Sequence, residues 1–186
     1  MASKLGFSIP VSLITNDGKA AQKFCLDKLS IIKPISIGKI YDKEDTIVFQ
    51  TNQVDENKSI SNLEYCPSYF QEQCEKDYEL RVTIVGRKVF SVRIDSQLHE
   101  ETRTDWRFNP DLLCYSETQI PKDLEDKCFA LLAALQLDFG AFDFIVRDNQ
   151  YIFLEVNANG QWGWLEGKLG IKISDAIVNY LMGVNQ

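Results

Sequence analysis

Two carboxylates and one amide near the end of the chain have the types and the spacing of a metal site. Asp143 lies in the apolar segment FGAFDFIV, and Glu155 and Asn157 lie in the segment YIFLEVNAN that follows it. The polar residues between the two segments predict a hairpin of antiparallel strands. With a loop at 148–150, the pairing of the strands places Asp143 directly opposite Glu155 and puts Asn157 on the same face.

Opposed carboxylates of this kind need a neutralising partner. Side chains directly across an antiparallel ladder have Cβ atoms about 5 Å apart, so two negative charges there repel each other unless a proton or a cation neutralises them. Mg²⁺ takes oxygen ligands, and one or two carboxylates, an amide oxygen and substrate phosphates form a usual set. The alternative is that Asp143 and Glu155 are solvated charges on an exposed sheet face of an acidic protein. The spacing alone leaves both interpretations open.

The other face of the same hairpin is expected to belong to the core. Successive side chains of a strand point to opposite faces, so the apolar residues between the polar ones fall together. The residues expected on this core face are Phe142, Phe144, Val146, Ile152, Leu154 and Val156.

The composition is that of an ordinary globular protein with an acidic balance. The chain has 186 residues, of which 45% are hydrophobic and 25% charged, enough for one sizeable domain or two small lobes with a buried core. Its formal net charge of −7 argues against a surface for nucleic acid, which would need a basic stripe. A nucleotide ligand is compatible with this charge, because a divalent ion and a few local Lys and Arg residues can offset it.

Residue counts disfavour several other kinds of site. The five cysteines are scattered and never have C-x-x-C spacing, which indicates reduced thiols rather than a zinc site or a disulfide framework. His99, the only histidine, lies in a very polar stretch and is expected at the surface rather than in a catalytic triad. No apolar run reaches membrane-spanning length and the N-terminus lacks a signal peptide, so we expect no membrane partner and a cytoplasmic location.

The elements that must position these residues follow from periodicity and capping. Asn16 and Asp17 are expected to cap an early helix, and Ser174 to cap a final helix that runs through Met182. Pro121 precedes a helix whose leucines recur at helical spacing, and the stretch around Trp106 is expected to be an ordered loop. Strands are expected at 46–50, 69–73, 78–85 and 88–94, the last two joined by a turn at Gly86-Arg87.

Three charged residues are expected at fixed positions on extended segments: Lys33 before Pro34, and Glu79 and Arg81 in the strand at 78–85. Pro34 keeps Lys33 extended at the end of the apolar segment IIK, although a solvated lysine explains the pattern as well. Glu79 and Arg81 lie two residues apart in one strand and therefore share a face, where a simple ion pair between them is one explanation.

Four segments, taken in order, resemble the ATP-grasp superfamily, and within it the ligases of the microviridin or graspetide type that modify ribosomally made peptides. They are IIKPIS, FQEQCEKDYELRVTIVG, DWRFNP, and LDFGAFDFIV with FLEVNANGQW. The resemblance extends from Leu5 to Leu181. It implies an α+β fold, with one ATP-grasp domain over 1–186 whose two lobes hold ATP between antiparallel sheets. Residues 16–73 would form the smaller nucleotide-gripping lobe and residues 74–186 the C-terminal metal-binding lobe.

The resemblance assigns nucleotide-binding roles to six residues, five of which lie in IIKPIS and FQEQCEKDYELRVTIVG, whereas the sixth, Asn109, lies in DWRFNP. Lys33 matches the lysine that contacts ATP phosphates. Glu72 and Gln73 match the hinge strand whose backbone and side chains meet the adenine. Glu79 matches the acidic residue that accepts the ribose hydroxyls. Arg81 belongs to the same motif and is expected to point toward the substrate or the phosphates.

The resemblance also assigns the metal site. Asp143, Glu155 and Asn157 match the magnesium ligands, the same three residues that the hairpin pattern selects. Arg107 and Asn109 match a polar loop beside the γ-phosphate. We therefore expect Asp143→Asn or Glu155→Gln to weaken magnesium-dependent nucleotide binding while preserving the fold.

The reaction that the resemblance implies is the joining of a carboxylate to an amine or a hydroxyl, with hydrolysis of ATP to ADP and phosphate. The carboxylate attacks the γ-phosphate, and the second nucleophile opens the resulting acylphosphate, so the enzyme needs no nucleophile of its own. Lys33 and Arg107 are the expected catalytic residues, because they and magnesium neutralise charge. The implied cofactors are ATP and Mg²⁺, with two ions expected and Mn²⁺ as an alternative. The implied substrate is a peptide or another carboxylate.

One domain that the resemblance leads us to expect has no counterpart in the sequence. Ligases of this type usually have a further N-terminal domain of about a hundred residues ahead of the lysine strand. We expect it to be missing here through natural loss or truncation, or to be supplied by a separate chain, and a homodimer is the other partner arrangement. The competing function is an ATP- and Mg-binding regulatory or scaffolding module without ligase activity.

Overall fold

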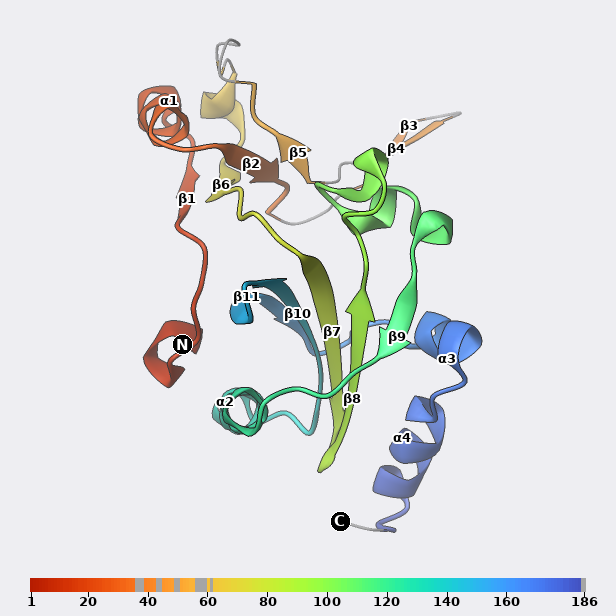
Figure 1. Cartoon of the computed structure of the whole chain (residues 1–186). Helices are drawn as coiled ribbons and strands as arrows, with labels where there is room; N and C mark the ends of the chain where they lie inside the picture. The colour runs from red at the N-terminus through yellow and green to blue at the C-terminus, as the bar shows by residue number, and fades with distance from the viewer. Residues whose placement is uncertain (36–38, 43–44, 49–50, 56–59, 61, 185–186) are drawn as a thin grey trace. The chain divides into compact units, whose positions relative to one another are not determined.

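The chain forms two compact units, each made of separate segments. The computed structural model describes residues 1–35, 39–42, 45–48, 51–55, 60 and 62–184. Unit 1 comprises Met1–Ile9, Lys76–Leu98 and Leu112–Gln186, and unit 2 comprises Pro10–Glu75 and His99–Asp111 (Figure 1). The chain therefore passes from one unit to the other several times.

Unit 1 is built on a five-stranded antiparallel sheet with the order β11-β10-β7-β8-β9. Strand β7 is buried along almost its whole length, which fits its apolar and β-branched residues. It turns into β8 at Gly86, whose φ of 56° favours glycine. The predicted strands at 78–85 and 88–94 are confirmed. The strands are β7 (Tyr78–Val85), β8 (Lys88–Ile94), β9 (Tyr115–Glu117), β10 (Phe139–Arg147) and β11 (Gln150–Asn157).

Helices pack on both faces of this sheet (Figure 1). The helix α2 (Lys122–Leu135) and the short 3-10 helix η1 (Ala2–Leu5) cover one face. The helices α3 (Gly163–Leu169) and α4 (Ile173–Leu181) cover the other. Burying each large apolar side chain contributes about 1.5–3 kcal/mol. The core under α2 contains Phe7, Leu80, Val82, Ile84, Leu124, Cys128, Leu131, Leu132, Phe142, Phe144, Val146 and Phe153.

The helix predicted after Pro121 is confirmed as α2, which begins directly after that proline. Asp123 and Glu125 lie in its first turn, where the partial positive charge of a helix N-terminus stabilises carboxylates. Gln136 ends the helix in the left-handed conformation with a φ of 57°.

The start of α4 corrects the prediction for Ser174. The helix begins at Ile173, so Ser174 lies inside its first turn and is not the N-cap. The backbone N–H and the hydroxyl of Ser174 both donate to Oε1 of Glu166, at 2.7 and 2.9 Å. These hydrogen bonds, the backbone one foremost, lower the pKa of Glu166. The cap is therefore a carboxylate supplied by α3.

Unit 2 contains a four-stranded antiparallel sheet with the order β1-β6-β2-β5 and a separate hairpin of β3 and β4. Helix α1 (Gly18–Leu26) contributes Ala21 and Cys25 to the core of this unit. Asp17 caps α1 as predicted, because its Oδ1 accepts the N–H of Lys19 at 2.8 Å. The strands are β1 (Ser12–Thr15), β2 (Ser30–Lys33), β3 (Lys39–Asp42), β4 (Asp45–Val48), β5 (Asn52–Gln53) and β6 (Ser68–Glu72).

The strands predicted at 46–50 and 69–73 correspond to β4 and β6, each of which begins one residue earlier, and residues 49–50 lie outside the described residues. The stretch around Trp106, predicted to be an ordered loop, contains short 3-10 helices. The four further 3-10 helices are η2 (Leu63–Tyr65), η3 (Glu100–Thr102), η4 (Trp106–Phe108) and η5 (Pro110–Leu112).

Two predictions about single residue types also hold. His99 is exposed, and all five cysteines are free thiols. Within the part of the chain that the structure describes, no helix combines the length and the hydropathy needed to cross a membrane.

Candidate functional site

The hairpin of β10 and β11 places Asp143 directly opposite Glu155. This confirms the predicted pairing of the two carboxylates. Asp143 is 6% exposed, whereas Glu155 and Asn157 are exposed to solvent. Oδ1 of Asn157 accepts the backbone N–H of Asn159 at 2.9 Å, which orients this amide at the end of the strand.

The turn of this hairpin is one residue shorter than the sequence predicts. Arg147 pairs with Gln150, so that only residues 148–149 form the loop. Both loop residues have a positive φ, of 49° and 59°, as the favoured two-residue hairpin turn requires. A β-bulge between Asp143 and Phe144 then restores the pairing of the carboxylates.

The bulge changes which apolar residues face the core. Leu154 is its extra residue, and Phe153 consequently lies opposite Phe144 and is buried in the core under α2. The prediction was wrong for Ile152 and Leu154, since Ile152 shares the face of Asp143 and neither residue belongs to that core. A shift of one residue reverses the direction of every side chain beyond it. The other four residues predicted for the core face do pack there.

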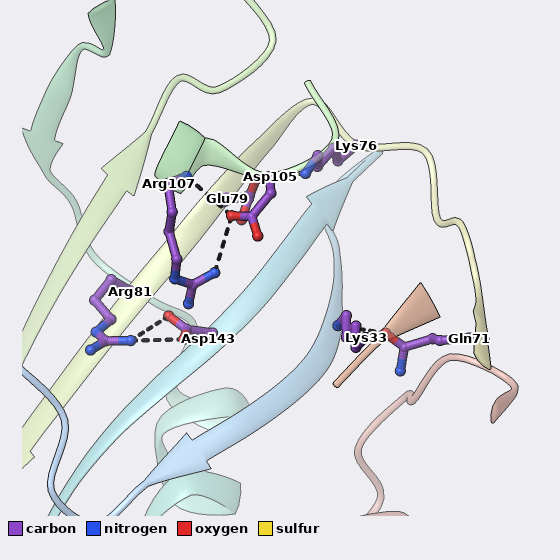
Figure 2. Close-up of polar contacts among 8 residues, drawn as sticks. All are labelled: Lys33, Gln71, Lys76, Glu79, Arg81, Asp105, Arg107 and Asp143. Atoms are coloured by element: carbon purple, nitrogen blue, oxygen red, sulfur yellow. Dashed lines mark hydrogen bonds and ion pairs between the residues drawn. The ribbon is translucent and has the colours of Figure 1, made fainter. Parts of the chain in front are cut away.

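Asp143 forms a buried ion pair with Arg81 of β7 (Figure 2). The two residues are partners in the ladder of β7 and β10, so Arg81, Asp143 and Glu155 form one row across three strands. Both carboxylate oxygens of Asp143 lie 2.7 Å from Nη1 of Arg81, and Nη2 donates to the carbonyl of Gln161 at 3.1 Å. Nε of Arg81 is buried and has no hydrogen-bond partner among the described residues. The charge of Asp143 is thus neutralised within unit 1.

The residues predicted as metal ligands fit the chemistry of Mg²⁺, because Asp143, Glu155 and Asn157 all offer oxygen atoms. The described residues contain no group of three or more His, Cys, Asp or Glu side chains placed to hold a metal ion. A metal site at this place would need the amide of Asn157 and oxygens of a bound ligand in addition to the two carboxylates.

Glu79 is paired with Lys76 rather than with Arg81 (Figure 2). Nζ of Lys76 donates to Oε1 of Glu79 at 2.6 Å, and each side chain is 8% exposed. A charge-assisted hydrogen bond of this length between buried groups fixes both side chains. Sequence reasoning misses Lys76, and the spacing of the two residues in KDYE is the signal that points to it.

In unit 2, Lys33 lies at the end of β2, and its Nζ donates to Oε1 of Gln71 on β6 at 2.9 Å (Figure 2). Gln71 is 3% exposed, and its Nε2 donates to the hydroxyls of Tyr69 at 2.9 Å and Ser12 at 3.1 Å. The network joins three neighbouring strands and holds the ammonium of Lys33 in place. Sequence reasoning also misses Gln71, although a glutamine directly after the aromatic pair in SYFQE is a visible signal.

Glu72 and Gln73 lie where β6 ends. Their backbone N–H groups donate to the carbonyls of Val11 at 2.9 Å and Leu29 at 2.8 Å, so these two donors are committed to unit 2 itself. The carboxylate of Glu72 lies 3.9 Å from Nζ of Lys28. Oε1 of Gln73 is buried without a hydrogen-bond partner in the described part of the chain. This acceptor suits a donor group of a ligand.

Arg107 and Asn109 lie in one polar segment of unit 2. Oδ1 of the buried Asp105 accepts the backbone N–H of Arg107 at 3.1 Å and its Nη1 at 3.3 Å (Figure 2). The guanidinium of Arg107 also lies over the ring of Trp106, 4.9 Å from its centroid. Asn109 donates to Oε2 of Glu101 at 3.1 Å. These contacts orient the side chains of Arg107 and Asn109, the two residues predicted to lie beside the γ-phosphate.

The comparison with known families decides the identity of the fold. The RimK-like ATP-grasp domain matches residues 1–181. The chain belongs to this family. Its two antiparallel sheets with their helices are those of the ATP-grasp fold, which confirms the α+β architecture predicted from the sequence. Among curated proteins, none matches this ATP-grasp chain.

Three solved structures are similar to this ATP-grasp chain. A Chryseobacterium gregarium RiPP-associated ATP-grasp ligase, in complex with ADP and a leader and core peptide, is 36% identical, with a TM-score of 0.90 over 98% of this chain and 57% of its own. The macrocyclase MdnC from Microcystis aeruginosa MRC, bound with the precursor peptide MdnA, is 34% identical, with a TM-score of 0.85 over 98% of this chain and 59% of its own. The ATP-grasp ligase PsnB, complexed with a phosphomimetic variant of its minimal precursor, Mg and ADP, is 21% identical, with a TM-score of 0.74 over 98% of this chain and 55% of its own. At this identity the likeness to PsnB shows the fold alone. The chain spans just over half the length of these relatives.

Proposed function

We propose that the chain is the ATP-binding and catalytic part of a ligase that joins a carboxylate to an amine or a hydroxyl of a peptide through an acylphosphate. The row of Arg81, Asp143 and Glu155 carries this proposal, because it puts oxygen ligands for a metal and a cation for an anion on one sheet face of an ATP-grasp domain. Two relatives support it, since one is a ligase in complex with ADP and peptide and the other a macrocyclase bound with its precursor peptide.

Asp143, Glu155 and Asn157 are proposed to hold Mg²⁺, with two ions expected and Mn²⁺ as an alternative. When bound, Mg²⁺ would neutralise the charge that develops on the transferred phosphoryl group. Arg81 supplies a fixed positive charge next to Asp143 in the same row.

The nucleotide is proposed to interact with residues that the structure already orients. Lys33, which Gln71 holds, contacts the phosphates as a point charge. The adenine contacts the side chain of Glu72 and Oε1 of Gln73, which has no hydrogen-bond partner among the described residues. Glu79 accepts the ribose hydroxyls while it retains its hydrogen bond from Lys76.

Arg107 and Lys33 are the proposed catalytic residues. Asp105 holds Arg107 by its main chain and its guanidinium, so this cation is positioned before a substrate arrives. Asn109 is proposed to bind a γ-phosphate oxygen through its amide. The reaction needs no enzyme nucleophile, because the substrate carboxylate attacks the γ-phosphate itself.

The rest of the peptide site is proposed to lie outside this chain. The solved relatives are longer, so a further domain in the same protein or in a separate chain, or a homodimer, is proposed to complete it. The five free thiols fit a cytoplasmic location, where cysteines stay reduced.

Single-turnover incubation with Mg-ATP and candidate peptides tests this function. The peptides should contain Asp or Glu as acyl donors and Lys, Ser or Thr as acceptors. The expected result is ADP release that depends on the peptide, with a peptide product lighter by one water. Tight Mg-ATP binding without ADP release for any peptide, in the presence of the completing domain, would instead favour a regulatory or scaffolding module.

A further inference from the structure

The ion pair of Arg81 and Asp143 has an unusual geometry for an arginine and a carboxylate. Strong pairs of this type are commonly forked, with two guanidinium nitrogens facing two oxygens. Here a single nitrogen, Nη1, lies 2.7 Å from both oxygens of Asp143, and Nε is buried without a hydrogen-bond partner in the described structure. Arg81 therefore uses only part of its donor capacity on this carboxylate.

A cation bound between Asp143 and Glu155 would compete with the ion pair of Arg81 and Asp143. Asp143 lies between Arg81 on β7 and Glu155 on β11, and it is the direct ladder partner of both. In the structure, both of its oxygens contact the guanidinium of Arg81. A cation that binds Asp143 together with Glu155 would compete with the guanidinium of Arg81 for these oxygens.

From this arrangement we propose that Arg81 is the counter-ion of Asp143 in the metal-free protein, and that Asp143 exchanges this contact for a divalent cation when the metal site fills. The inference rests on the proposed function, because it takes Asp143 and Glu155 as metal ligands. Arg81 then lowers the affinity of the empty site for metal and keeps the acidic row folded without it. The exchange frees the guanidinium donors of Arg81 only after the metal has bound. The metal should therefore bind before any anion that contacts Arg81.

The test uses Mn²⁺ alone as the probe, with free Mn²⁺ followed by electron paramagnetic resonance. Arg81→Met removes the charge but keeps an unbranched side chain. A charge of opposite sign within about 4–6 Å shifts carboxylate equilibria by one to three powers of ten, so the variant should bind Mn²⁺ about tenfold more tightly or better. Metal-free, it should melt at a lower temperature than the wild type, and Mn²⁺ should raise its melting temperature by more. Arg81→Lys keeps a cation and should stay close to the wild-type affinity.

A matched control is available on the neighbouring strand. Arg93 of β8 pairs with Asp95 at 2.7 Å, but Arg93 and Asp95 are 43% and 25% exposed, and Arg93 lies on the opposite face because its ladder partner is Leu80. Arg93→Met should leave Mn²⁺ affinity unchanged. If it tightens binding as much as Arg81→Met, a general loss of positive charge explains the effect and the proposal is overturned.

A second measurement uses the wild-type chain and so does not depend on how the variants fold. The ¹⁵N resonance of the Arg81 side chain, identified by its absence in Arg81→Lys, is followed while Mg²⁺ is added. A change in shift and faster guanidinium rotation in step with metal binding supports the exchange. An unchanged Arg81 signal on a metal-loaded site, or weaker Mn²⁺ binding by Arg81→Met, overturns it while leaving the proposed function intact. No binding of Mn²⁺ by the wild type, even with ADP, overturns both.

Discussion

Gly160 packs directly against Ala141. A Cβ added to Gly160 would lie 2.3 Å from the Cβ of Ala141 and 3.3 Å from Nη2 of Arg81. The segment after β11 therefore crosses the sheet at a place where only a glycine fits, and its next residue, Gln161, supplies the carbonyl that accepts Nη2 of Arg81. The close approach of this segment helps to hold the guanidinium beside Asp143.

Gly160→Ala should destabilise unit 1, because the new methyl group forces this segment away from Ala141. The expected loss is about 1–3 kcal/mol in the free energy of unfolding, measured by urea denaturation. Gly167→Ala is the matched control, since a Cβ at this position in α3 meets no atom within 4 Å. Gly167→Ala should raise the free energy of unfolding by about 0.5–1 kcal/mol, because alanine is more stable than glycine inside a helix. Equal stabilities for the two variants would contradict the close packing at Gly160.

Asp143→Asn and Glu155→Gln should differ in stability although both should weaken magnesium-dependent nucleotide binding. The expectation that both variants preserve the fold is kept, but Asp143→Asn should also lose stability, because Asp143 neutralises the buried Arg81. Removing one partner of a buried pair costs roughly 3–5 kcal/mol. Glu155 is exposed, so Glu155→Gln should change the free energy of unfolding by about 0.5 kcal/mol or less. Denaturant titrations without metal check the difference, and comparable losses in the two variants would argue against it.

Gln71→Met should weaken both unit 2 and its interaction with nucleotide. The substitution keeps the volume but removes the acceptor for Lys33 and the donor for Tyr69 and Ser12. Leaving buried polar groups without this partner should cost about 1–3 kcal/mol. Calorimetry with Mg-ATP should show weaker binding, because Lys33 is less well oriented. Tyr69→Phe removes one hydroxyl and leaves the acceptor for Lys33 in place, so it should bind Mg-ATP as the wild type does.

The cap that Glu166 forms should make stability depend on pH. Hydrogen bonds from Ser174 lower the pKa of Glu166 in the folded protein. Its contribution is therefore present above the unfolded pKa and is lost as the pH falls through the lower folded value. Glu166→Gln should melt below the wild type at neutral pH, and the difference should shrink below about pH 4. A difference in melting temperature that is the same at both pH values would rule out the ionised carboxylate as the cause.

The sequence predicts much of unit 1, because its strands have clear apolar alternation and its hairpin turns are short. The pairing of Asp143 with Glu155 was correct, although the route to it was not. The loop was counted one residue too long, and the bulge at Leu154 compensates for that error. A bulge has no signature in alternation alone, so the faces of Ile152 and Phe153 could not be assigned from the pattern.

The partners of the site residues were harder to predict than the residues themselves. Lys76, Gln71 and Asp105 each hold a predicted residue in place, through contacts of 2.6, 2.9 and 3.1 Å. Gln71 lies far from Lys33 in the sequence, so only the fold brings them together. The cap of α4 was missed for the same reason, because its carboxylate comes from Glu166 in the preceding helix.

The bulge at Leu154 links two length changes that look independent in the sequence. If the two-residue turn is kept, adding a residue after it without other change would shift the paired strands against each other and break the row of Arg81, Asp143 and Glu155. Adding that residue while deleting Leu154 would bring the acidic pair back into line. Homologous ligases with a longer turn are therefore expected to lack the bulge, and grafting this hairpin into another scaffold requires transferring both features together.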